Sequence, residues 1–187
     1  MLAPKLKRAA PLRPCRFTRR RPIIDLRPLH SIAATDIDAL LDTTFGADRR
    51  GRTAYLIRAG MAAIDALSFA ALKDGTLAGT IQCWPIALHR DEGGAVPLVM
   101  VGPVAIRPDL QGLGYGRALM AEMQATADAL DLGDALMLIG DPEYYARFGF
   151  SADCTGLWRA PGPVERHRLL AHGCAVPDAA GMLGPRR

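Results

Sequence analysis

Three glycines at alternate positions stand where an apolar run gives way to a run of helix-forming residues. The segment reads Gln111-Gly112-Leu113-Gly114-Tyr115-Gly116, and Val104, Ile106 and Pro108 precede it. Glycine has no Cβ atom, so a ligand can come close to the backbone at these positions. The first turn of the following helix offers unpaired N–H groups and the positive end of the helix dipole. The segment therefore predicts a cradle for a phosphate or pyrophosphate group that needs no lysine.

The spacing distinguishes this turn from two other phosphate-binding motifs. The dinucleotide fingerprint requires Gly-x-Gly-x-x-Gly, whereas the glycines here follow Gly-x-Gly-x-Gly. The P-loop requires Gly-Lys followed by Ser or Thr, and the sequence contains no such run. A glycine-rich helix start that binds no ligand is the structural alternative.

A second block of interest follows the next short apolar run, about 30 residues further along the chain. It reads Gly140-Asp141-Pro142-Glu143-Tyr144-Tyr145-Ala146-Arg147-Phe148-Gly149-Phe150. Asp and Pro are typical of the N-cap and the first position of a helix, so a short helix is expected over Pro142 to Phe148.

Together the two blocks resemble the GNAT superfamily of acyl-CoA N-acetyltransferases. The first matches its acyl-CoA loop, Gln/Arg-x-x-Gly-x-Gly/Ala, at Gln111, Gly114 and Gly116. The second is similar to the Gly-Asp-Pro-x-Tyr-Tyr-x-Arg-Phe-Gly-Phe block of a subgroup of predicted bacterial N-acetyltransferases. The resemblance covers Ile23 to Cys174. It implies a single-domain GNAT fold of the α/β (α+β) class, whose mixed central sheet of about six to seven strands is splayed at strand 4 and flanked by helices.

The resemblance also implies roles for individual residues. Tyr145 would be the general acid that protonates the departing sulfur, and the N–H of Val104 would stabilise the oxyanion on the thioester carbonyl. Arg117 is compatible with a phosphate contact and equally with a solvated helix face. The acetyl-CoA cofactor would contact Val104, Ala105, Ile106, Gln111, Gly112, Leu113, Gly114, Tyr115, Gly116, Arg117, Ile139, Gly140, Tyr144, Tyr145 and Phe148.

Alternating strands and helices must position these residues. Thr35-Asp36-Ile37-Asp38 resembles a capping box that opens a helix, and Gly46 is its expected end. Asp74-Gly75 predicts a hairpin turn. Gly102-Pro103 interrupts a long apolar run, and because proline cannot donate a ladder hydrogen bond, that strand should bulge or splay there. We expect further helices at Arg52 to Gly60 and Gly114 to Leu130, and strands at Ile23 to Leu26, Leu67 to Leu72, Leu77 to Leu88, Val96 to Ile106 and Ala135 to Ile139, with two more within Ala152 to Cys174.

Charge and composition divide the chain into three parts. Residues 1–22 hold eight basic residues and no acid, which leaves 15 basic against 19 acidic groups in the remainder. We expect a disordered basic tail at 1–22, the acetyltransferase domain at 23–176 and a frayed C-terminal tail at 177–187. The basic tail resembles a transit peptide, and a solvated tail, or residues upstream of the true start, is the plainer interpretation. Since the domain itself is mildly acidic, a nucleic-acid partner is expected only through this tail.

Other composition features narrow the expected partners. No run of 18 apolar residues is present, so no membrane partner is expected. The four cysteines form no Cys-x-x-Cys or zinc pattern, which favours reduced thiols, no bound metal and a cytoplasmic location. A homodimer is the default expectation for the oligomeric state.

The acceptor is expected to be a primary amine of a small molecule or a peptide, and the acidic domain favours a cationic one. Many members of the superfamily supply a Glu base from the fourth strand, but Val96 to Ile106 contains no acid. Candidate bases lie on the preceding loop, at His89, Asp91 and Glu92. The candidate acceptor contacts are Gln82, Trp84, Glu92 and Trp158.

The function predicted is therefore transfer of acetyl from acetyl-CoA to an amine by direct attack, with no role for Cys83 as a nucleophile. The missing strand acid motivates an alternative, a non-catalytic acyl-CoA-binding sensor or interaction module. In a third hypothesis the arginine-rich tail docks the domain on RNA or another anionic surface.

Overall fold

A mixed sheet of eight strands forms the centre of the computed structural model, which describes residues 24–186. The strand order is β1-β2-β3-β4-β5-β7, with β8 beside β3 and β6 beside β8. All neighbours are antiparallel except the pairs β4–β5 and β6–β8. The strands are β1 Asp25–Pro28, β2 Phe69–Lys73, β3 Thr76–Arg90, β4 Ala95–Ile106, β5 Leu136–Ile139, β6 Trp158–Arg159, β7 Leu169–His172 and β8 Gly181–Pro185.

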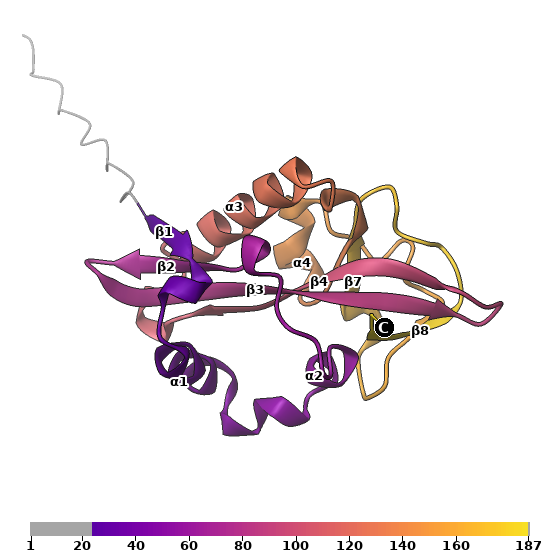
Figure 1. Ribbon diagram of the computed structural model, residues 1–187, viewed down its shortest axis with the longest axis horizontal. Helices are drawn as coiled ribbons and strands as arrows, with labels where there is room; N and C mark the ends of the chain where they lie inside the picture. The colour runs from indigo at the N-terminus through magenta and orange to yellow at the C-terminus, as the bar shows by residue number, and fades with distance from the viewer. Residues whose placement is uncertain (1–23, 187) are drawn as a thin grey trace, which may run out of the picture.

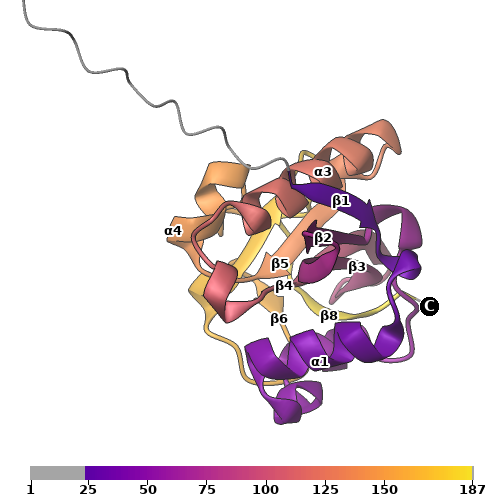
Figure 2. The same ribbon diagram turned by 90° about the vertical axis from the view of Figure 1, so that its left-hand side faces the viewer.

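Helices cover both faces of this sheet (Figure 1). Helix α3 lies on one face, and α1 lies on the other, as Figure 2 shows from the side. Leu119, Met120 and Met123 of α3 are fully buried against the sheet, while Leu40 and Leu41 of α1 pack on the opposite face. The helices are α1 Ala34–Phe45, α2 Thr53–Ile57, α3 Tyr115–Ala129 and α4 Pro142–Tyr145.

The local signals for turns and helix ends were mostly right. Asp74 and Gly75 have φ of 51° and 78°, as a two-residue hairpin turn between β2 and β3 requires. Gly46 ends α1 with φ of 89°. The capping box was wrong, because α1 begins one residue before Thr35, after Ala33, which makes no side-chain cap bond. Helix α2 is also shorter than expected.

Strand β4 bulges and then separates from β5, as predicted. Ile81 pairs with Val104 and Cys83 pairs with Val101, so two residues of β4, Gly102 and Pro103, stand opposite one residue of β3. On its other side, β4 pairs with β5 only through Val99 and Met100. Beyond Met100, β4 and β5 therefore no longer pair with each other, and the sheet opens between them.

The prediction of a frayed tail from Pro177 onward was wrong. Strand β8 pairs with Ile86 to Arg90 of β3 and also carries β6, and its Leu183 is 1% exposed. Glycine and proline dominate β8 and have low strand propensity, so tertiary packing outweighs local preference here. The described sheet thus has eight strands rather than six to seven. Ile23 and the basic tail lie outside the described residues, and the first strand begins at Asp25.

Candidate active site

Two clefts meet where β4 and β5 separate. The glycine-turn cleft, of about 1190 Å³, lies along the start of α3. The arginine cleft, of about 1300 Å³, lies between α2, β4 and the segment that precedes β7. Both are lined by Phe45, Val104, Tyr144 and Tyr145. The two clefts therefore adjoin at these residues, and together they are called the channel, with Val104 and the two tyrosines at its junction.

Glycine geometry opens the first cleft to a ligand. All residues from Gln111 to Arg117 line it. Gly112 and Gly114 have φ of +76° and +96°, and a Cβ on either would meet no protein atom within 4 Å. Gly114 is also the N-cap of α3, so the unpaired first-turn N–H groups of this helix lie beside that open space. Gly116 has another purpose, because a Cβ there would lie 2.9 Å from the hydroxyl of Tyr144.

The glycine-turn cleft is cationic. Arg117 and Arg147 line it, and among the described residues no Asp or Glu does. The guanidinium of Arg147 lies 4.9 Å from the centre of the Tyr144 ring, which holds it beside the junction. Arg107, by contrast, pairs with Asp109 at 2.6 Å on the surface. Cationic side chains and an open helix N-terminus together suit a ligand with several phosphate groups.

Helix α4 sets the position of Tyr145. Asp141 caps this helix, and its Oδ1 accepts a hydrogen bond from the backbone N–H of Glu143 at 2.9 Å. A Cβ on Gly140 would overlap the Tyr145 ring, so glycine is required where β5 meets α4. Burial, together with neighbouring Tyr144, raises the pKa of Tyr145 to about 12. The phenol therefore keeps its proton at neutral pH, which suits a proton donor.

Removal of this cap should loosen the tyrosine pair. We expect Asp141→Ala to lower the free energy of unfolding by about 1 kcal/mol, because the Glu143 N–H loses its acceptor. Glu143→Ala is the matched control, since its exposed side chain makes no hydrogen bond in the described part of the chain. Chemical denaturation of both variants measures the difference, and an equal loss in both would contradict the capping role.

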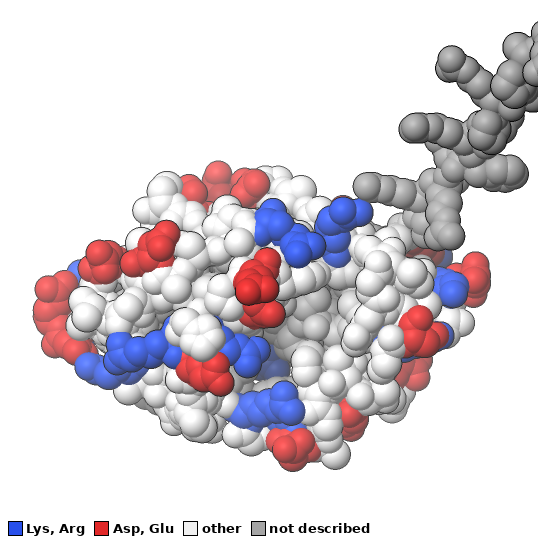
Figure 3. All heavy atoms as spheres, turned by 180° about the vertical axis from the view of Figure 1, so that it is seen from behind, with Lys and Arg blue, Asp and Glu red and all other residues white. Residues whose placement is uncertain are grey.

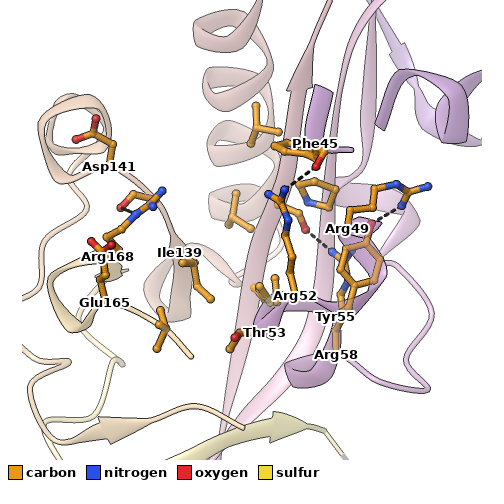
Figure 4. Close-up of a pocket in the computed structure, with 18 of the residues that line it drawn as sticks. Phe45, Arg49, Arg52, Thr53, Tyr55, Arg58, Ile139, Asp141, Glu165 and Arg168 are labelled. Atoms are coloured by element: carbon orange, nitrogen blue, oxygen red, sulfur yellow. Dashed lines mark hydrogen bonds between the residues drawn. The ribbon is translucent and has the colours of Figure 1, made fainter. Parts of the chain in front are cut away.

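The arginine cleft gathers side chains from segments far apart in sequence (Figure 4). Arg49 is buried and pairs with Asp38 and Asp42, each at 2.6 Å. Arg58 is 4% exposed, and its Nη1 donates to the carbonyl of Gly102 at 2.9 Å. Its guanidinium also lies 4.1 Å from the Tyr55 ring centre and 4.2 Å from that of Trp84. Arg58 therefore supports the β4 bulge through its hydrogen bond to Gly102.

Most residues predicted to contact the cofactor line the channel. Val104, Ile106, Gln111 to Arg117, Tyr144 and Tyr145 line the glycine-turn cleft, while Ile139 and Gly140 line the arginine cleft. Two predictions need correction. Ala105 points to the opposite face of β4, where it packs on Leu40 and Leu41, because side chains alternate along a strand. Phe148 packs against the core on the α3 side and lines neither cleft.

The structure does not place the four predicted acceptor contacts in the lining of either cleft. Gln82, Trp84, Glu92 and Trp158 line neither cleft. Trp158 is a core residue, 1% exposed, whose Nε1 donates to the carbonyl of Pro177 at 3.1 Å. Glu92 pairs with Arg90 at the exposed turn between β3 and β4. Trp84 approaches the cleft only through its stacking on Arg58.

The two other candidate bases are engaged away from the channel. Asp91 forms an ion pair with Arg159, and the Nε2 of His89 lies 3.1 Å from the carbonyl of Pro185. The carboxylates that do line the arginine cleft are Asp48, Asp141 and Glu165.

Within residues 24–186 no three His, Cys, Asp or Glu side chains are grouped as metal ligands would be. No helix in this range is long and apolar enough to span a bilayer.

The sequence profile of the acetyltransferase (GNAT) family matches residues 35–150, so this chain belongs to that family. It is 25% identical to the uncharacterized N-acetyltransferase YhbS of Escherichia coli K12 over 159 residues, 82% of this chain and 89% of that protein. The crystal structure of E. coli YhbS in complex with CoA is also similar, with a TM-score of 0.69 and 24% identity. The structural match covers 87% of this chain and 89% of the YhbS chain.

A further solved structure is similar. It is a GNAT family acetyltransferase from Brucella melitensis, in complex with acetyl-CoA, with a TM-score of 0.54 and 25% identity. The match covers 81% of this chain and 97% of that one. The comparisons therefore confirm the predicted superfamily and the predicted fold class.

Proposed function

We propose that this protein transfers the acetyl group of acetyl-CoA to a primary amine by direct attack. In this proposal acetyl-CoA occupies the glycine-turn cleft and the amine enters through the arginine cleft. The observation that carries the proposal is the meeting of the two clefts at Val104 and Tyr145. The CoA and acetyl-CoA bound in structures of similar fold support the choice of cofactor.

The contacts to acetyl-CoA follow from the cleft. The backbone of Gln111 to Gly116 and the start of α3 would bind the pyrophosphate, with Arg117 and Arg147 as cationic partners. The pantetheine arm would lie along the edge of β4 that β5 leaves unpaired, where its amides can pair with the strand as an extended peptide does. Ile139 and Gly140 would form the facing wall.

The chemistry then needs two groups at the junction. The amine nitrogen attacks the thioester carbon, and the Val104 N–H would stabilise the negative charge that develops on the carbonyl oxygen. As the carbon–sulfur bond breaks, the Tyr145 hydroxyl would give its proton to the sulfur. The products are the acetylated amine and the CoA thiol, and Tyr145 recovers a proton from water.

The amine must also lose a proton, and β4 offers no carboxylate to take it. Asp48, Asp141 and Glu165 line the arginine cleft, and all three are exposed to solvent. We therefore assign this proton to the water of the open cleft rather than to one dedicated base.

Cys83 has no part in this scheme. Its side chain is fully buried in the core, and burial raises the pKa of the thiol far above neutral pH. We expect Cys83→Ala to keep kcat within about threefold of wild type while losing some stability from the small cavity. Steady-state kinetics measure this, and a dead variant together with an acetylated Cys83 in the wild type would contradict direct attack.

The test of the function is release of free CoA thiol from acetyl-CoA when amines are added to the purified full chain. Thiol release that depends on both protein and amine supports an acetyltransferase. Saturable binding of acetyl-CoA with no thiol release for any amine class would instead favour the sensor, for which the missing acid on β4 is the motivating observation.

A further inference from the structure

Three guanidinium groups in the arginine cleft have no carboxylate partner within residues 24–186. Arg52 precedes α2, Arg58 follows it, and Arg168 ends the short helical turn Arg166–Arg168 before β7. None of them belongs to an ion pair in the described part of the chain. Arg49, in the same cleft, differs because two carboxylates neutralise it.

Each of the three guanidinia donates to one backbone carbonyl. Arg52 donates to Phe45 at 2.6 Å, Arg58 to Gly102 at 2.9 Å, and Arg168 to Gly140 at 3.5 Å. A guanidinium carries five N–H donors in a planar fork, so each group retains donors for a ligand. Figure 4 shows Arg52 and Arg58 on one side of the cleft and Arg168 on the other.

Three carboxylates line the same cleft, and none of them is buried as Arg58 is. Asp48, Asp141 and Glu165 are all exposed. Asp141 is already the cap of α4, and Glu165 lies 3.3 Å from His167. Water and salt screen these exposed carboxylates, as they screen the exposed Arg52 and Arg168, whereas the buried charge of Arg58 acts with little screening. In Figure 3 both basic and acidic side chains border a hollow near the middle of the face.

We propose that the acceptor is an amine that also carries a carboxylate or phosphate group, and that Arg52, Arg58 and Arg168 bind this anionic group. The proposal rests on the proposed function. Guanidinium forks match the geometry of carboxylate and phosphate, which they can bind through two parallel hydrogen bonds. The acceptor suggested by the cleft thus differs from the cationic one suggested by the net charge of the domain.

The walls and the buried charge refine this substrate class. Apolar residues that include Met100, Val101, Ile139 and Val164 line the cleft beside the arginines, so an acceptor with an apolar body would fit. Burial lowers the pKa of Arg58 to about 10, which leaves it charged at neutral pH. A fixed positive charge disfavours an ammonium nearby and therefore favours the neutral amine that attacks the thioester.

The test compares acceptors with and without the anionic group, with each kcat/KM expressed per neutral amine present at the assay pH, because the anionic group also shifts the pKa of the amine. The first set is phenylalanine, phenylalaninamide and phenethylamine, and the second is phosphoethanolamine and ethanolamine. Thiol release from acetyl-CoA gives kcat/KM for each. We expect the anionic member of at least one set to exceed its neutral counterparts by about 10- to 100-fold, as charge-assisted hydrogen bonds imply. The set that shows the preference distinguishes carboxylate from phosphate.

Variants then assign the preference to the arginines. Arg52→Gln and Arg168→Gln change exposed side chains, so both should fold, and Arg58→Lys keeps the buried charge while it removes the fork. Each should reduce kcat/KM for the preferred anionic amine by about 10-fold or more. Arg52→Gln and Arg168→Gln should leave the neutral amine nearly unchanged, whereas Arg58→Lys, which alters the support of the β4 bulge, should lower the ratio of kcat/KM for the anionic amine to that for the neutral amine. Arg50→Gln is the control, because Arg50 is exposed, pairs with Asp38 and lines neither cleft.

Acetyl-CoA binding, measured separately by calorimetry, distinguishes the two proposals. A protein that neither binds acetyl-CoA nor releases thiol would contradict the proposed function itself. A protein that binds acetyl-CoA but releases no thiol with any amine would also contradict it. A protein that binds acetyl-CoA and acetylates neutral amines as readily as anionic ones, or acetylates neutral amines only, would overturn only the substrate class. Arginine variants that retain the wild-type preference for anionic amines would likewise overturn the substrate class and leave the proposed function standing.

Discussion

Tyr145→Phe is expected to lower kcat by about 10²- to 10⁴-fold, the range that general acid catalysis usually contributes. The ring remains, so its edge-on contacts with Tyr144 and Phe150 should hold helix α4 in place. Affinity for acetyl-CoA should therefore stay near that of the wild type. Steady-state kinetics with calorimetric titration separate the two effects.

The neighbouring tyrosine identifies which phenol donates the proton. Tyr144→Phe also removes a hydroxyl from the junction of the clefts, and we expect a much smaller loss of kcat from it. The pH profile gives a second check. Because the pKa of Tyr145 is raised to about 12, the phenol stays protonated below that value, and its ionisation should not reduce kcat until the pH approaches 12. Equal losses in both variants would contradict the assignment of Tyr145.

Gly114→Glu is expected to weaken acetyl-CoA binding by about 100-fold or more. Gly114 has φ of +96°, a conformation that costs an L-residue about 1–2 kcal/mol. The new side chain would also enter the open space beside the start of α3 and place a negative charge where the proposal puts the pyrophosphate. Strain, lost volume and charge repulsion all act in the same direction.

A control for strain alone is present elsewhere in the chain. Gly93, in the turn between β3 and β4, has φ of +98° and, like Gly114, has no atom within 4 Å of its ideal Cβ. Gly93 lines neither cleft. Gly93→Glu should thus lose similar stability and keep acetyl-CoA affinity. Calorimetric titration with acetyl-CoA compares the affinities of the two variants. Retained binding in Gly114→Glu would contradict the placement of the pyrophosphate.

The parts of the site that sequence predicted are those whose signals are local. The glycine turn, the start of α3 and the Asp141 cap depend on backbone preferences of a few adjacent residues, and all three were located correctly. The bulge in β4 followed from Pro103, which cannot donate to a neighbouring strand. Such effects need no knowledge of distant contacts.

The arginine cleft could not be predicted in this way. In the sequence, Arg58 is a charged residue near a helix end with nothing to distinguish it. Only the fold brings it within hydrogen-bond distance of the Gly102 carbonyl, 44 positions further along the chain. The same holds for Arg168 and Gly140, which lie 28 positions apart. Strand β8 was missed for a related reason, since its pairing with β3 and the burial of Leu183 outweigh the poor strand propensity of Gly181 and Pro185.

Titration of the purified wild-type chain with acetyl-CoA, followed by isothermal calorimetry, tests most directly whether the channel is a CoA site. Saturable binding of one acetyl-CoA per chain is the predicted result, with free CoA as a competitor for the same site. Absence of binding at acetyl-CoA concentrations up to about 1 mM, the upper end of typical substrate constants, would contradict it. The glycine turn would then be a structural helix start, and the proposed transfer reaction would have no donor.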